Sequence, residues 1–134
     1  MATTKVLVAT DGPWIRDQVR GALLRSGTQV LSVSRGQDVR DRVRNERPDL
    51  VILDLQIANM GGIAVAIDLH LEAAAGRLPD VPILLLLDRE HDRFLAKRAD
   101  ADGELVKPLD PATLRHAAET LLARRAAAAA GSGS

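Results

Sequence analysis

The sequence contains no cysteine, which excludes disulfide bonds, thiolate catalysis and zinc sites with thiolate ligands. Aromatic side chains are almost absent as well, with only Trp14 and Phe94 in the whole chain. So few rings argue against a platform on which nucleobases stack. The longest apolar run, residues 81–87, is far shorter than the roughly 20 residues that a membrane-spanning helix needs.

The sequence also lacks an excess of either charge, since its 18 basic and 18 acidic side chains give a formal net charge of zero. A dedicated nucleic-acid-binding domain usually carries a basic surplus, so we expect no direct DNA binding. A length of 134 residues with 46% hydrophobic and 27% charged residues is typical of one globular domain. No signal-peptide pattern opens the chain, and we therefore expect a cytoplasmic protein without membrane contact.

The most informative stretch runs from Asp49 to Asp54 and consists of four apolar residues between two carboxylates. A run without polar alternation is typical of a strand buried on both faces, as in a parallel sheet covered by helices. Such sheets bind ligands at the carboxyl ends of their strands. The pattern therefore places Asp54 at a ligand-binding edge, followed by a loop that closes on Gly61 and Gly62.

Strand-like and helix-like segments alternate along the rest of the chain. Strands are predicted at 5–9, 28–33, 50–53, 81–87 and 104–106, and helices at 13–27, 37–45, 63–75, 89–99 and from 111 onward. Asp110 and Pro111 form a helix start, with the aspartate as N-cap. This alternation predicts an α/β fold, a doubly wound five-stranded parallel sheet flanked by five helices, in residues 1–125. Residues 126–134 are predicted to be an Ala-rich helix end and a flexible Gly/Ser tail.

Three polar residues end three of these predicted strands, namely Asp11, Asp54 and Lys107. They converge if the strands are parallel, because all carboxyl ends then lie at one edge. Two crowded carboxylates repel each other, and Mg²⁺ relieves the repulsion with oxygen ligands while keeping water and phosphate in its shell. A lysine adds a charge for phosphate oxygens, so the trio suits phosphoryl transfer onto a carboxylate. The alternative is that each residue merely ends its strand in water.

Five stretches carry a resemblance to a known family: residues 5–13, 48–55, 60–62, 81–83 and 99–108. Together they resemble the receiver domain of bacterial two-component response regulators, and the resemblance extends to about Leu122. It implies a flavodoxin-like fold with the strand order 2-1-3-4-5.

The resemblance also implies roles for individual residues. Asp54 matches the aspartate that accepts a phosphoryl group, and Lys107 matches the lysine that contacts this group. Asp11 matches the acidic residue that binds Mg²⁺, together with Asp54 and the backbone carbonyl of Gln56. The Lys107–Pro108 peptide bond is expected to be cis. The donor would be a histidine kinase or phosphotransfer protein, and the only catalysis would be self-phosphotransfer and autodephosphorylation.

Several positions depart from the family pattern. Thr10 stands where a second acidic residue is usual, which should weaken Mg²⁺ binding, and Gly61 stands where aspartate is frequent. Leu87 replaces the Thr or Ser whose hydroxyl bonds the phosphoryl group, a bond worth roughly 1.5–3 kcal/mol. Glu104 replaces the Tyr or Phe that swings inward on phosphorylation, and a glutamate is costly to bury unpaired. These departures are expected to weaken the conformational switch.

Two hypotheses for the function therefore remain. The chain is either a single-domain response regulator that signals to an unknown effector protein by docking, or an atypical pseudo-receiver that acts as a phosphorylation-independent interaction module. A flavodoxin-like ligand-binding domain lacks supporting residues. In receivers, partners or a weak homodimer meet at the face formed by the fourth helix, the fifth strand and the fifth helix; here that face would carry Arg89, Arg93, Lys97, Glu104, Arg115 and Glu119.

Overall fold

The computed structural model describes residues 3–25, 27–57 and 60–132. Its strands form one sheet in the order β2-β1-β3-β4-β5, and all four neighbouring pairs are parallel. In chain order the strands and α-helices are β1 (Thr4–Ala9), α1 (Pro13–Leu23), β2 (Thr28–Val33), α2 (Val39–Glu46), β3 (Leu50–Asp54), α3 (Gly62–Ala74), β4 (Ile83–Leu87), α4 (Arg93–Arg98), β5 (Gly103–Val106) and α5 (Pro111–Ser132). The predicted doubly wound fold and its strand order are confirmed.

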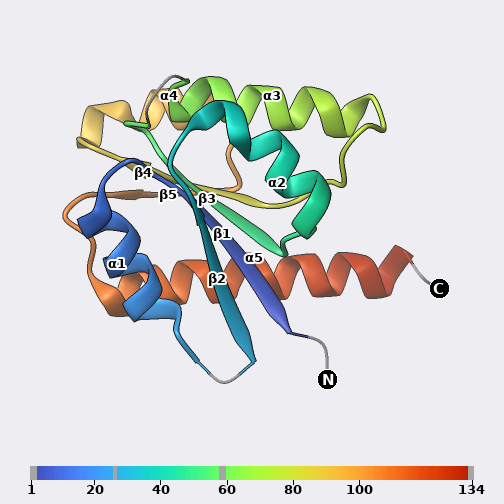
Figure 1. Ribbon diagram of the computed structural model, residues 1–134, viewed down its shortest axis with the longest axis horizontal. Coiled ribbons are helices and arrows are strands. Elements are labelled where there is room, and N and C mark those ends of the chain that lie inside the picture. The colour runs from blue at the N-terminus through green and yellow to red at the C-terminus, as the bar shows by residue number, and fades with distance from the viewer. Residues whose placement is uncertain (1–2, 26, 58–59, 133–134) are drawn as a thin grey trace.

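Helices cover the sheet on both faces, and Figure 1 shows α3 and α4 along the top with α5 along the bottom. Successive strand residues point to opposite faces, so Leu7 packs in one apolar cluster while Val6 and Val8 pack in the other. The first cluster includes side chains of α2, α3 and α4, and the second includes side chains of α1 and α5. Strands β3 and β4 are buried along their whole length between these layers, which explains their unbroken apolar sequences.

The register of the sheet aligns the carboxyl ends of its central strands. Ala9 of β1 lies beside Leu53 of β3, and Asp54 lies beside Leu86 of β4. Residues that follow β1, β3, β4 and β5 therefore meet at one edge, as the sequence predicts.

The starts of β4, α2 and α4 differ from the sequence prediction. β4 begins at Ile83 rather than at 81, because Pro82 has no backbone N–H to donate to a neighbouring strand. The helices α2 and α4 begin only after 3₁₀ turns, Gly36–Asp38 and Glu90–Asp92. In the second turn the Asp92 carboxylate accepts a hydrogen bond from the backbone N–H of Arg89, 3.0 Å away.

The last helix begins as the sequence predicts. The carboxylate of Asp110 accepts hydrogen bonds from the backbone N–H and the hydroxyl of Thr113, both at 2.9 Å. These bonds hold the pKa of Asp110 below its ordinary value. α5 continues through the alanine run to Ser132, beyond the tail start expected at Gly131, because alanine is the strongest helix former. Residues 133 and 134 of that expected tail lie outside the described residues. None of the described helices combines the length and apolarity that a membrane crossing needs.

Candidate functional site

Asp54 occupies the centre of the site, at the carboxyl end of β3, and its residue is only 2% exposed. Three groups satisfy its buried carboxylate. The Thr10 hydroxyl donates to Oδ2 at 2.7 Å, and the backbone N–H of Gln56 donates to Oδ1 at 3.1 Å. The Lys107 ammonium donates to Oδ1 at 2.5 Å. Asp54 is thus held as a paired carboxylate with its oxygens directed at the sheet edge.

Lys107 bridges two carboxylates rather than one. Its Nζ also donates to Oδ1 of Asp88 at 2.9 Å, and the side-chain amide of Gln56 donates to Oδ2 of Asp88 at 2.9 Å. Burial alone would lower the pKa of Lys107, but its hydrogen bonds to Asp54 and Asp88 and their charges raise it above the ordinary value. Burial would likewise raise the pKa of Asp88, and the bonds from Lys107 and Gln56 bring it below the ordinary value. Both Lys107 and Asp88 are therefore charged at neutral pH.

Asp11 lies two residues beyond the end of β1 and is exposed. Among the described residues, no hydrogen bond or ion pair engages its carboxylate. Because β1 pairs with β3, Asp11 emerges at the same sheet edge as Asp54. The structure thus places Asp11, Asp54, Gln56 and Lys107 at one edge, while only the last three are joined by direct hydrogen bonds.

The donor chemistry at this edge fits Mg²⁺. The described residues contain no group of three or more His, Cys, Asp or Glu side chains arranged for a metal ion. Two carboxylates, Asp11 and Asp54, with the backbone carbonyl of Gln56 would be the available protein ligands. Mg²⁺ commonly binds through one or two carboxylates and completes its octahedron with water and phosphate oxygens, so this small set suffices.

Two residues of the site were missed by sequence reasoning. Thr10 was treated only as the loss of a carboxylate, yet its hydroxyl bonds Asp54 and also accepts the backbone N–H of Gly12 at 3.1 Å. Asp88 received no role, although it too directly follows a buried strand. The strand-end rule that singled out Asp54 and Lys107 would have found Asp88.

The resemblance associates positions 87 and 104 with switching, and here both carry residues with other contacts. Leu87 is fully buried in the apolar cluster on the α3 side and brings no hydroxyl to the site. Glu104 lies on β5 with its Oε2 3.5 Å from Nη1 of Arg93, the first residue of α4. This buried oxygen accepts no hydrogen bond from the described part of the chain. The pair joins α4 to β5 in the structure.

Gly62, the first residue of α3, allows the loop after Asp54 to approach the strand end. A Cβ atom on Gly62 would lie 2.3 Å from the backbone oxygen of Asp54, closer than any real contact. The backbone N–H of Gly62 also donates to the carbonyl of Leu55 at 3.2 Å. The glycine therefore packs α3 directly against the backbone that carries Asp54.

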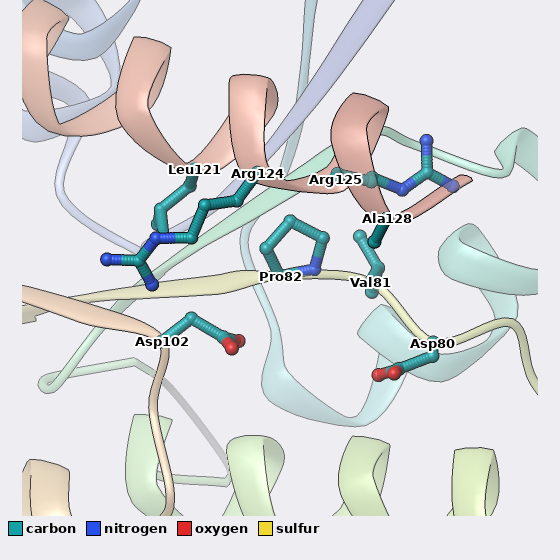
Figure 2. Close-up of a pocket in the computed structure, with 8 residues that line it drawn as sticks. All are labelled: Asp80, Val81, Pro82, Asp102, Leu121, Arg124, Arg125 and Ala128. Atoms are coloured by element: carbon teal, nitrogen blue, oxygen red, sulfur yellow. The ribbon is translucent and has the colours of Figure 1, made fainter. Parts of the chain in front are cut away.

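A hollow at the opposite edge of the sheet is unrelated to this site. In Figure 2, Arg124 and Arg125 reach from α5, with Asp80 and Asp102 on the facing side. Arg125 pairs with Asp49, and Asp102 accepts the backbone N–H of Ile83, so these groups fasten the amino ends of the strands. The remaining lining residues are Val81, Pro82, Leu121 and Ala128.

Comparisons with known proteins agree with this geometry. The family model of the response regulator receiver domain matches residues 6–119. The chain is 30% identical over 119 residues to Protein PilH of Pseudomonas aeruginosa, covering 89% of the chain and 98% of PilH. It is 31% identical over 127 residues to the alkaline phosphatase synthesis transcriptional regulatory protein PhoP of Bacillus subtilis, covering 93% of the chain. The chain spans only 51% of PhoP, and about half the length of most of the curated relatives it matches.

Solved structures are similar over almost the whole chain. The chemotaxis response regulator CheY4 of Vibrio cholerae superposes with a TM-score of 0.78 at 25% identity, covering 90% of this chain and 99% of CheY4. A putative response regulator from Chloroflexus aurantiacus superposes with a TM-score of 0.81 at 20% identity, covering 90% of this chain and 98% of that one. The second likeness concerns the fold alone.

Proposed function

Because the chain belongs to the response regulator receiver domain family, we propose that it accepts a phosphoryl group on Asp54 and signals by docking to another protein. The observation that carries this proposal is the contact of Lys107 with Asp54. A buried carboxylate whose oxygen touches an ammonium, at the edge where a parallel sheet binds ligands, is arranged as a nucleophile beside a phosphate-binding charge.

The proposed reaction is a phosphoryl transfer from a phosphohistidine donor. A carboxylate oxygen of Asp54 attacks the phosphorus and forms an acyl phosphate, while the P–N bond breaks and its electron pair stays on the histidine nitrogen, which takes a proton. The protein contributes positioning and charge in such transfers. Lys107 would face the phosphoryl oxygens, and Thr10 and the Gln56 N–H would fix the plane of the attacking carboxylate.

We propose that Asp11, Asp54 and the carbonyl of Gln56 hold Mg²⁺. When bound, this ion would neutralise the charge that accumulates on the transferred group. The partners are proposed to be a histidine kinase or phosphotransfer protein as donor and an effector protein as target. Neutral net charge supports a role without direct DNA binding, and we propose a cytoplasmic location with residues 1–125 as the receiver domain.

A mass measurement tests the proposed function. We expect the intact protein to gain one phosphoryl group on incubation with Mg²⁺ and phosphoramidate, a small-molecule donor with a P–N bond. Chelation of Mg²⁺ with EDTA should strongly reduce the yield, and peptide mapping should place the group on Asp54. No adduct under conditions that modify a typical receiver would refute phosphoryl acceptance.

The second candidate function is a phosphorylation-independent docking module. It is favoured by the buried Leu87 and by the ion pair of Glu104 with Arg93, because Leu87 and Glu104 stand at the two positions that the resemblance associates with switching. Absence of an adduct, together with an unchanged partner affinity after Asp54→Asn, would support this alternative.

Restoring the missing carboxylate should strengthen Mg²⁺ binding. Thr10→Asp adds a negative charge next to Asp54, and we expect Mg²⁺ affinity to rise roughly tenfold, because charges a few ångströms apart interact by more than about 1 kcal/mol near a protein surface. Isothermal titration calorimetry measures the change. The control Thr28→Asp adds the same charge at the start of β2, where the amino ends of the strands lie, away from the site. Equal affinities in wild type and Thr10→Asp would refute a metal site beside Thr10.

A further inference from the structure

Asp88 contacts Lys107 beside Asp54, and the proposed function gives this acidic residue no role. It follows β4 directly, and both of its carboxylate oxygens are engaged, one by Lys107 and the other by the amide of Gln56. Its side chain is 30% exposed, whereas that of Asp54 is 3% exposed. Asp88 therefore lies between the buried acceptor site and solvent.

Two carboxylates share the Lys107 ammonium. On the β1 side of Asp54 the neighbouring group is the neutral hydroxyl of Thr10, and on the β4 side a second carboxylate shares the ammonium. A lysine ammonium has three N–H donors, and here two of them go to Asp54 and Asp88. One N–H remains, and a phosphoryl group on Asp54 would bring several further acceptor oxygens to the same ammonium, so it would compete with Asp88 for the N–H that Asp88 now holds.

We propose that Asp88 is a positioning residue that restrains Lys107 and competes with the phosphoryl group on Asp54 for the lysine ammonium. This inference rests on the proposed phosphoryl acceptance. Gln56 supports the restraint, because its amide holds Asp88 while its backbone N–H holds Asp54. Lys107 would serve the phosphoryl group fully only after its bond to Asp88 is broken.

The Asp88→Asn substitution tests the charge of the side chain while keeping its shape. Asp88→Asn preserves the size of the side chain and an oxygen for the Gln56 amide, but it removes the charge that attracts Lys107. We expect Asp88→Asn to accept the phosphoryl group from phosphoramidate roughly fivefold faster than wild type, since a hydrogen bond between charged groups is stronger than a neutral one. A time course of intact mass gives both rates.

A second measurement reports on Lys107 without phosphorylation. In acylation only the neutral amine, which has a free electron pair, attacks the reagent and displaces its leaving group, so the pH dependence of labelling reports the pKa of each lysine. Asp88→Asn should shift the Lys107 profile to lower pH and raise its labelling at fixed pH severalfold relative to the exposed Lys97. A loss of packing alone would expose Lys107 and, because burial lowers its pKa, would move the profile to higher pH instead.

Asp80→Asn is the matched control, because Asp80 precedes β4 at the opposite edge of the sheet and lines the hollow in Figure 2. It should leave both the rate and the Lys107 profile unchanged. An unshifted profile in Asp88→Asn would overturn the restraint, and a shifted profile with an unchanged or slower acceptance rate would overturn the competition. If wild type and both variants gain no phosphoryl group, the proposed function and the competition fail together, while the labelling profile still decides whether Asp88 restrains Lys107.

Discussion

The Asp54→Asn variant is expected to gain no phosphoryl group under conditions that modify the wild-type chain. A neutral amide is a poor nucleophile, and it cannot form the acyl phosphate that a carboxylate forms. Asparagine has nearly the same shape. Its side-chain oxygen can still accept the Gln56 N–H, and its amide N–H can donate to the Thr10 hydroxyl that now bonds the other oxygen. The loss should therefore reflect chemistry rather than unfolding, and circular dichroism with thermal unfolding would verify that the fold persists.

The neighbouring carboxylates of Asp11 and Asp88 are the alternative sites of modification that the Asp54→Asn variant tests. Asp11 and Asp88 lie at the same edge of the sheet, but Asp11 is exposed and Asp88 is engaged by Lys107 and Gln56. Among these acidic side chains, Asp54 alone combines burial with a direct contact to the lysine. An adduct of undiminished yield in Asp54→Asn would contradict the assignment, and peptide mapping would then show which carboxylate carries the group. Asp80→Asn should be modified like wild type.

The Gly62→Ala variant is expected to be less stable than wild type by roughly 1–3 kcal/mol, the usual cost of forcing an extra methyl group into a packed site. Its Cβ would lie 2.3 Å from the Asp54 carbonyl oxygen, and 3.0 and 3.1 Å from two further backbone atoms of residues 54 and 55. Backbone atoms of a buried strand end cannot rotate away as a flexible side chain can. Either α3 or the end of β3 must shift, so the rate of phosphoryl acceptance on Asp54 should fall as well.

Gly21→Ala is the matched control for this substitution. A Cβ on Gly21 meets no atom within 4 Å, and the residue lies inside α1, where alanine is favoured over glycine by roughly 0.5–1 kcal/mol. Urea unfolding should therefore show opposite signs for the two glycine-to-alanine changes, with acceptance altered only in Gly62→Ala. Equal stabilities in both variants would contradict the close packing of α3 against the acceptor strand.

The residues that depart from the family pattern make specific contacts in the structure. Thr10 replaces a carboxylate with a hydroxyl that bonds Asp54, and Asp88 supplies a carboxylate on the other side of the acceptor. Leu87 and Glu104 occupy the switching positions with an apolar contact and an ion pair. A chain with these features is expected to retain the chemistry at Asp54 more readily than a large conformational response.

The sequence by itself determined the architecture of this protein and which strand-end residues lie at one edge of its sheet. The unbroken apolar run that leads to Asp54 is a local signal, because burial on both faces removes polar alternation, and Lys107 follows the shorter apolar pair Leu105 and Val106. In a parallel sheet the carboxyl ends share an edge, so these strand ends predicted a common site without coordinates. The start of β4 was misplaced because the apolar composition of residues 81–82 obscured the missing N–H of Pro82.

Only the tertiary structure decided which side chains bond one another. Thr10 meets Asp54 across 44 residues of chain, and Lys107 meets Asp88 across 19. Such pairs depend on sheet register and on side-chain direction to within an ångström, which no local pattern encodes. For the same reason, the closeness of Gly62 to the Asp54 backbone and the pairing of Glu104 with Arg93 emerged only when α3 and α4 were packed against the sheet.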